Sequence, residues 1–481
     1  MNELNIDIAD YAVKYGMNNN VEYIEARIIA TTEETYTARN GRFLGIVQNE
    51  RQGMGIRILK NGNFAFGSTE KLETKNIESL IDELIKIADG YKRKEPITLS
   101  EEKVEVAEWK TEVKIPFKDI AREEKQQFIR DLDKLLKAEV GKSLKNRIAF
   151  LFLYTDKKFI VNSEGSKIKS QNSLISMNTM NTAKGKNGTE QRFLSMGSTA
   201  GWEWLENEKI IDRIIHDCKG LVKTAQNAKA MKFDKPISVV ISGEVSGIMA
   251  HENVGHPSEG DRILGREGAQ AGESFYGDLL KEKELGEVII GNECVSIIDD
   301  PTIPKSSGFY LYDDECVKAR RRYLIKNGRL NELLINREYA ARFNTKSNAA
   351  ARAVMYNREP IPRMANTFFE PGDFTLEELI EDIKEGIFMK SFSEWNIDDR
   401  RFMSKYLGQE VYYIKNGEIT DIMIKRPVLE LTTQGILGNV TAVGKEITTT
   451  LGLCGKGDPM QGVPVCIGGP TVKLENIRVG D

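Results

Sequence analysis

Asn-Gly pairs set between apolar stretches constrain the fold of this chain more than any other local feature. The triplet Lys-Asn-Gly follows an apolar pair at Lys60, Lys326 and Lys415, and another Asn-Gly pair is Asn40-Gly41. Tight hairpins need a positive φ in their turn residues, which asparagine and glycine tolerate. The pattern therefore predicts antiparallel hairpins in both halves of the chain. A duplicated unit explains the triplets less well, because the flanking residues do not match over a full repeat period.

Apolar periodicity predicts the remaining elements of the N-terminal half. Strands alternate there with amphipathic helices, and a polar glycine-bearing loop is expected at 183–189. The predicted strands are 21–30, 147–154, 159–162 and 166–181, and hairpins that turn at Asn40-Gly41 and Asn61-Gly62 are predicted at 35–48 and 53–67. The predicted helices are 1–16, 76–92, 117–139 and 206–230.

The C-terminal half reads as mainly β. A buried strand at 236–243 leads into a helix at 244–255, and a long loop at 347–369 resembles segments that cover a site. A strand pair with Gly291-Asn292 between its strands is predicted at 287–298, further strands at 308–311, 318–333, 409–424 and 428–431, and one helix at 376–385. The expected class is α+β, with a β-meander-plus-helix domain at 1–231 and a mainly β catalytic domain at 232–481 that carries the metal-site helix.

The end of the 244–255 helix holds the most informative residues. His251 and His256 are two of only three histidines in the chain, and Glu252 directly follows the first. Neutral imidazole is the commonest side-chain metal ligand, and catalytic zinc sites use three protein ligands and leave a fourth position for water. The pattern predicts a metal site in which Glu252 takes a proton from a metal-bound water.

The spacing of the two histidines requires a change of backbone. Residues five apart lie about 140° apart around a regular α-helix, so both rings would not reach one ion. Gly255 leaves helical dihedrals freely, and Pro257 favours an extended residue before it. We therefore expect the helix to break at Gly255 and His256 to swing back towards His251.

These residues carry a resemblance to a known family. The sequence H-E-x-x-x-H followed by x-x-E-G-D resembles the signature of the TldD branch of the TldD/PmbA metallopeptidases, and the likeness extends to a glycine-rich block near the C-terminus. Pro257 departs from the pattern, which affects the expected local backbone and leaves the ligand chemistry intact. The resemblance implies Zn²⁺ as cofactor, an unfolded peptide as substrate, and a TldE/PmbA-like chain as partner, with a homodimer as the alternative.

A cysteine in the glycine-rich block is the candidate for the third ligand. Cys454 stands in Gly-Leu-Cys-Gly, on backbone that other groups approach closely, whereas Cys466 lies in an apparent strand at 462–467. From the residues alone, Cys454 fits a small buried hydrophobe or a ligand. The resemblance implies that it is the third zinc ligand and that Cys466 belongs to the core.

Two carboxylates and three arginines complete the candidate site residues. Glu259 and Asp261 follow His256 and are candidates for the outer partners of the ligands, because a ligating histidine commonly donates its far N–H to a carboxylate. A surface turn is the alternative for Glu-Gly-Asp. In the 347–369 loop, a group of arginines either holds a substrate carboxylate or is solvated. These arginines are Arg352, Arg358 and Arg363.

Composition limits the functional classes. The net charge of −4, from 68 basic and 72 acidic residues, gives no support for a nucleic-acid partner. Five widely spaced cysteines indicate a reducing compartment, and no apolar run reaches the length of a membrane span. We expect a cytoplasmic zinc peptidase. The alternatives are a non-catalytic peptide-binding or maturation scaffold, for which Glu252 would have no use, and a thiol hydrolase built on Cys454 and a histidine.

Overall fold

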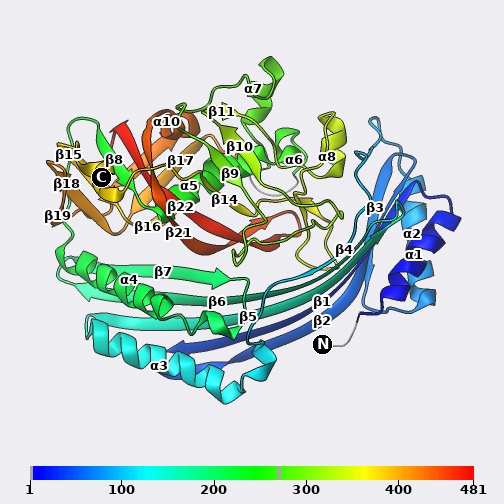
Figure 1. The fold of residues 1–481 in the computed structure, drawn as a ribbon, viewed down its shortest axis with the longest axis horizontal. Coiled ribbons are helices and arrows are strands. Elements are labelled where there is room, and N and C mark those ends of the chain that lie inside the picture. Colours follow the sequence, from blue (N-terminus) through cyan, green and yellow to red (C-terminus); the bar gives the residue numbers. More distant parts are fainter. Residues whose placement is uncertain (1–3, 268–271, 481) are drawn as a thin grey trace.

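A curved seven-stranded sheet forms most of the N-terminal half (Figure 1). The structure is a computed structural model that describes residues 4–267 and 272–480. The strands are β1 (Tyr23–Arg39), β2 (Arg42–Lys60), β3 (Asn63–Thr69), β4 (Val106–Lys110), β5 (Leu144–Asn162), β6 (Lys167–Gly185) and β7 (Gly188–Ser198). Their order is β3-β2-β1-β5-β6-β4, with β7 also paired to β6. All pairs are antiparallel except β4 with β6.

Four helices cover one face of this sheet. They are α1 (Ile6–Asn18), α2 (Thr74–Asp89), α3 (Arg122–Val140) and α4 (Glu208–Asn227). Alternate residues of β1 point towards them, as the period of two in a strand requires. Ile24 and Ile28 pack in one core with α1 and α2, and Tyr36 and Ala38 pack in another with α3 and α4. The opposite face looks towards the C-terminal half of the chain (Figure 1).

A ten-stranded mixed sheet forms the framework of the C-terminal half. Its strands are β8 (Ile237–Ile241), β9 (Ile297–Asp299), β10 (Arg322–Lys326), β11 (Arg329–Leu330), β14 (Asn366–Phe369), β15 (Glu385–Met389), β18 (Val411–Lys415), β19 (Glu418–Met423), β21 (Val440–Lys456) and β22 (Gln461–Ile477). The order is β11-β10-β9-β14-β22-β8-β15-β18-β19, and β21 pairs with β22. The long β21–β22 hairpin reaches from this sheet towards the N-terminal sheet (Figure 1).

Smaller elements complete the C-terminal half. A three-stranded sheet consists of β16 (Phe392–Ile397), β17 (Met403–Gly408) and β20 (Val428–Thr432), and a two-residue pair consists of β12 (Ala351–Arg352) and β13 (Ile361–Pro362). The helices are α5 (Gly243–Ala250), α6 (Gly260–Ile263), α7 (Tyr276–Glu282), α8 (Arg337–Arg342), α9 (Leu376–Ile380) and α10 (Thr433–Gly438). Among the described residues, no helix is both long and apolar enough to cross a membrane.

Helix α5 lies very close to β22 because both elements carry glycine at the contact. A Cβ on Gly247 would lie 2.2 Å from the backbone nitrogen of Gly468, and one on Gly243 would lie 2.0 Å from the carbonyl oxygen of Gly469. Any larger side chain at these positions would push the helix away from the strand. The close approach fixes the helix that leads into the histidine pair.

The fold confirms the predicted α+β class and the Asn-Gly turns. The predicted turn residues have positive φ, for example 48° at Asn327 and 73° at Gly328. The predicted 1–16 helix corresponds to α1 over its described part, since residues 1–3 lie outside the described range. The boundary predicted after residue 231 stays a prediction, and the two large sheets take their strands from opposite sides of it.

Several local predictions are wrong, each for an identifiable reason. The 183–189 segment is the tight end of the β6–β7 hairpin and contains only two residues outside the strands. In the 287–298 segment only β9 is a strand. The alternating residues Val288 and Ile290 are buried as the pattern suggested, but Ile289 makes only an isolated bridge with Arg329, and the Ile290 amide donates to the Gly328 carbonyl. Residues 308–311 likewise form no strand.

Candidate metal centre

The histidine pair lies where helix α5 changes its winding. Ser242 caps the start of α5 by accepting a hydrogen bond from the Glu244 amide. A π turn (His251–Gly255) follows the helix directly, and a 3₁₀ turn (His256–Ser258) follows that. The His256 amide donates to the His251 carbonyl, which is the i to i+5 bond that defines a π turn. The wider turn brings two residues five apart to the same side of the helix.

The predicted break at Gly255 is therefore wrong. Gly255 has φ −59° and ψ −59°, and His256 has φ −62° and ψ −43°, so both are right-handed helical. Glycine is needed for space: a Cβ on Gly255 would lie 1.8 Å from Met364 Sδ. Pro257 fits because it occupies the first turn of the 3₁₀ segment, where its missing N–H removes no bond.

Cys454 joins the two histidines from the distant β21 strand. Its Sγ lies 3.5 Å from His256 Nε2, and the ring centroids of His251 and His256 are 4.9 Å apart. Ligand atoms of the three residues all lie within 4.8 Å of one another, and all three side chains are buried. These residues come from two segments about 200 positions apart in the sequence, and β21 pairs with β22 against α5 to bring them together.

The donor set fits a zinc ion. Two imidazoles and one thiolate are ligand types that zinc prefers, and three protein ligands leave a fourth position open. His251 Nδ1 is buried and has no hydrogen-bond partner among the described residues, which is costly for a polar atom unless a ligand satisfies it. Burial lowers the pKa of His251, which favours the neutral, metal-binding imidazole.

The surroundings of the Cys454 thiol favour loss of its proton. Burial alone would raise its pKa, but the His256 ring and the Arg363 guanidinium outweigh that effect and lower the pKa to about 7. By contrast, burial raises the pKa of Cys466 and of Cys218 to about 12 in each case. Among these cysteines, only Cys454 has the environment of a thiolate.

Glu252 lies beside the histidines with a donor on each of its oxygens. Trp395 Nε1 donates to Oε1 at 3.1 Å, and Arg401 Nη1 donates to Oε2 at 3.3 Å. Burial would raise the pKa of Glu252, but the two histidines and Arg401 together lower it. The carboxylate is thus held in a fixed orientation in its proton-accepting form.

A buried set of charges supports His256 from behind. Glu259 Oε2 lies 3.1 Å from His256 Nδ1, which directs the Nε2 atom of that ring towards Cys454. Burial would raise the pKa of Glu259, but Lys456, His256 and Arg262 hold it well below its usual range. Glu259 contacts His256 directly, whereas Asp261 acts one step away, by accepting a 2.7 Å bond from Lys456.

The three loop arginines do not form one carboxylate-binding group. Arg352 donates to the carbonyls of Met364 and Pro464, and Arg363 donates to those of Cys454 and Gln461. These two arginines therefore fasten the 347–369 segment to the β21–β22 hairpin. The two predicted alternatives, binding of a substrate carboxylate and exposure to solvent, therefore do not describe Arg352 and Arg363. The segment was predicted as one long loop, but it contains β12 and β13 and ends in β14 of the ten-stranded sheet.

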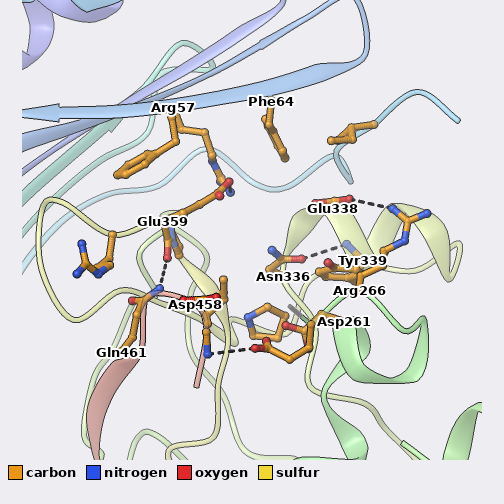
Figure 2. A pocket seen from close by; sticks show the side chains of 18 of the residues that line it. Arg57, Phe64, Asp261, Arg266, Asn336, Glu338, Tyr339, Glu359, Asp458 and Gln461 are labelled. Atoms are coloured by element: carbon orange, nitrogen blue, oxygen red, sulfur yellow. Dashed lines mark hydrogen bonds and ion pairs between the residues drawn. The ribbon is translucent and has the colours of Figure 1, made fainter. Parts of the chain in front are cut away.

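The third arginine, Arg358, borders a cavity of about 1100 Å³ between the two halves of the chain. Figure 2 shows Arg57 and Phe64 of the N-terminal sheet on one side of the cavity and Asp261 and Tyr339 on the other. Because Asp261 binds Lys456, this cavity shares a wall with the charges that support His256.

Sequence comparison decides the family. Profiles of the three PmbA/TldA metallopeptidase domains match this chain, with domain 1 at residues 24–88, the central domain at 115–230 and the C-terminal domain at 234–481. The chain belongs to the PmbA/TldD family. A metalloprotease of Methanocaldococcus jannaschii is 32% identical over 94% of this chain and 96% of its own length. A zinc metalloprotease TldD homolog of Saccharolobus solfataricus is 29% identical over 89% and 90%.

Solved structures agree on the PmbA/TldD fold. TldE from Thermococcus kodakarensis superposes with a TM-score of 0.77 at 15% identity, over 98% of this chain and 100% of that one. At this level of identity the likeness concerns the fold alone.

Sequence reasoning missed four residues around the centre of this PmbA/TldD chain, one of which is Arg262, bound to Glu259 through its Nε. Trp395 and Arg401 contact Glu252 from β16 and from the loop after it, and Lys456 contacts Glu259. The sequence contains a pattern that points to Lys456, because this residue stands two residues after Cys454 and strand periodicity places both on one face. No sequence pattern points to Trp395 or Arg401, since their segment is polar and its apolar residues follow no regular period.

Proposed function

We propose that this chain is a zinc-dependent peptidase of the TldD type. One observation carries the proposal: His251, His256 and Cys454 converge in a buried site with the Glu252 carboxylate beside them. The relatives named metalloproteases support the same class of reaction. His251, His256 and Cys454 would hold Zn²⁺, which when bound supplies a Lewis acid that polarises a carbonyl and acidifies water.

The protein's own groups account for the proton transfers of peptide hydrolysis. Glu252 accepts the proton of the attacking water and later delivers it to the leaving amine nitrogen. Trp395 and Arg401 hold the carboxylate in place for both transfers. Glu259, kept ionised by Lys456 and Arg262, fixes the orientation of the His256 ring. Water added to the peptide bond yields one carboxyl and one amine product.

The substrate class that fits this site is an unfolded peptide. The candidate ligands and Glu252 are buried, so a folded surface does not reach them. Within the described residues β21 pairs along only one edge, with β22, apart from an isolated bridge at Gly444. An extended chain added to the other edge near Cys454 would place its backbone beside the centre.

A comparison of folded and unfolded substrate tests this proposal. One protein, offered before and after reduction and denaturation, should be cleaved at least about tenfold faster in the unfolded form, because only an extended segment pairs with a strand edge. Appearance of fragments over time measures both rates. Equal rates on the two forms would contradict a requirement for an extended chain.

We also propose that the chain works in the cytoplasm with a TldE/PmbA-like partner or as a homodimer. The shared fold with TldE supports a partner of that type, and the five free cysteines support a reducing compartment. Sedimentation of the chain alone and mixed with such a partner distinguishes the two assemblies. A monomer under both conditions would contradict the proposal.

Proton release on zinc uptake tests the role of Cys454. With a thiol pKa of about 7, the metal-free protein has already lost that proton at pH 8, so zinc binding should release only about 0.1 proton from it. An ordinary thiol would release about 0.8 proton under the same conditions. Titration calorimetry in buffers of different ionisation enthalpy measures the number. Release close to one proton at pH 8 would show that Cys454 has no lowered pKa.

A further inference from the structure

Arg401 lies beside Glu252 with most of its hydrogen-bonding capacity unused. A guanidinium carries five N–H donors, and the one hydrogen bond of this group within the described part of the chain joins Nη1 to Glu252 Oε2 at 3.3 Å. Arg401 Nε is buried and has no partner there. The side chain is only 12% exposed. Spare donors of a buried cation therefore lie next to the proposed proton acceptor.

The other cations around the centre have partners that fix them to the backbone or to the charges behind His256. Arg363 donates to two backbone carbonyls, those of Cys454 and Gln461. Arg262 is bound to Glu259, and Lys456 is bound to Asp261, Glu259 and the Pro362 carbonyl. Arg363 Nε is also buried without a partner among the described residues, but both Nη atoms of Arg363 are held by backbone carbonyls, whereas the one bond of Arg401 is to the carboxylate that would take the proton.

The backbone holds Arg401 in an unusual conformation. Its φ is +62°, in the left-handed region that residues other than glycine rarely adopt. Its amide donates to the Asp398 carbonyl, its carbonyl accepts from Thr433 Oγ1, and the Thr433 amide donates to the neighbouring Phe402 carbonyl. Such conformations persist where several bonds fix them, and they concentrate at functional sites. Here they set the direction in which the side chain leaves the loop.

We propose that Arg401 is a catalytic residue that donates hydrogen bonds to the negative charge developing on the carbonyl oxygen of the scissile peptide bond. The inference rests on the proposed peptidase function. When water adds, its oxygen bonds to the carbonyl carbon, its proton moves to Glu252, and the π electron pair of the carbonyl moves to its oxygen. The C–N bond then breaks, the oxygen returns that pair to the carbonyl, and Glu252 passes its proton to the leaving nitrogen.

The proton transfer changes which acceptor attracts the spare donors of Arg401, while Nη1 stays on Glu252. Before water attacks, Glu252 is an anion and the strongest acceptor within reach of the guanidinium. After it takes the proton it is neutral, and the carbonyl oxygen carries the charge instead. The spare donors then meet a stronger acceptor at the moment when stabilisation lowers the barrier. Binding that is strongest at this stage raises kcat more than it lowers KM.

Kinetics and inhibitor binding together test the proposal. Arg401→Ala should lower kcat about 100- to 1,000-fold, the range seen when one such donor is lost, with KM changed less than about threefold. A phosphinic peptide, which carries a tetrahedral anion at the scissile position, should bind more weakly by the same factor as the loss in kcat/KM. Titration calorimetry reports that affinity without any turnover. Millimolar guanidinium should restore part of the activity of Arg401→Ala.

Matched variants separate this role from a structural one. Arg401→Lys keeps the charge and should retain more activity than Arg401→Ala. Arg400→Ala removes the neighbouring exposed arginine, which pairs with Asp278, and should behave as the native protein. All three variants should hold one zinc and unfold at the native temperature. If Arg401→Ala fails to fold, Arg401→Lys and its phosphinate affinity still decide the question.

Four results would overturn the proposal. A higher KM at unchanged kcat would make Arg401 a ground-state contact. A defect confined to peptides with a free C-terminal carboxylate would make it a carboxylate anchor. Loss of zinc would show that Arg401 has a structural role. Unchanged phosphinate affinity would show that Arg401 does not bind the negative charge on the carbonyl oxygen. If the native zinc-loaded protein cleaves no peptide, the peptidase proposal fails, whereas phosphinate binding still reports on Arg401.

Discussion

Replacing Glu252 with glutamine is expected to abolish most peptidase activity while leaving the metal in place. The amide keeps the size of the carboxylate and accepts the Trp395 bond at its oxygen, but it cannot take a proton from water. General base catalysis contributes about 100- to 10,000-fold, and kcat should fall by a factor in that range. Steady-state kinetics on an unfolded peptide measures the loss, and metal analysis should still find about one zinc per chain.

A nearby glutamate provides the control. Glu394 lies in β16 next to Trp395, is exposed, and accepts a bond from Asn396. Glu394→Gln makes the same chemical change outside the centre and should keep native activity. Full activity in Glu252→Gln would eliminate the proposed proton acceptor. Loss of zinc from that variant would instead assign the carboxylate to metal binding.

Removing the Cys454 thiol should empty the metal site. Cys454→Ser leaves two histidines, and two neutral imidazoles are too few for tight zinc binding. Zinc content should fall from about one per chain to a small fraction, and activity should fall with it. Mass spectrometry of the native complex or a colorimetric zinc assay measures the stoichiometry.

Two other cysteines and a chelator separate the possible roles of Cys454. Cys466 lies in β22 with a pKa raised to about 12 by burial, and Cys294 donates to the Val440 carbonyl outside the centre. Cys466→Ser and Cys294→Ser should keep their zinc. If Cys454→Ser kept zinc and activity, the residue would be a small core side chain. If it kept zinc and lost activity, and if the native protein resisted chelators, Cys454 would be a thiol nucleophile.

The residue types of the centre were predictable from sequence, whereas their local backbone was not. Scarce histidines around a glutamate pointed to His251 and His256 because their chemistry stands out against the composition. Gly255 suggested a break because glycine adopts many backbone dihedrals. The sequence does not show that a neighbouring side chain leaves no space for a larger residue at this position. The close approach of Met364, more than 100 residues away, is a property of the packed molecule.

Residues that act through long-range packing were beyond sequence reasoning. Arg401 and Trp395 approach Glu252 from a polar segment about 150 positions away. Nothing in that segment distinguishes Arg401 from its exposed neighbour Arg400 until the turn at Arg401 is seen to adopt a positive φ. In the same way, Arg352 and Arg363 were predicted either to hold a substrate carboxylate or to be solvated, because a sequence does not show which backbone carbonyls an arginine will contact.

The π turn at His251–Gly255 has a consequence for how metal clamps are recognised in genomes. The number of residues between two histidine ligands on a helix reflects the local pitch of the helix. It does not change the way in which the pair binds a metal. H-E-x-x-H on an α-turn and H-E-x-x-x-H on a π turn both present two imidazoles on one side, with a glutamate after the first. A single inserted residue converts one into the other, and the i to i+5 bond absorbs it without breaking the helix. Searches with a rigid four-residue spacing pass over this centre, whereas searches that allow one insertion retrieve both kinds.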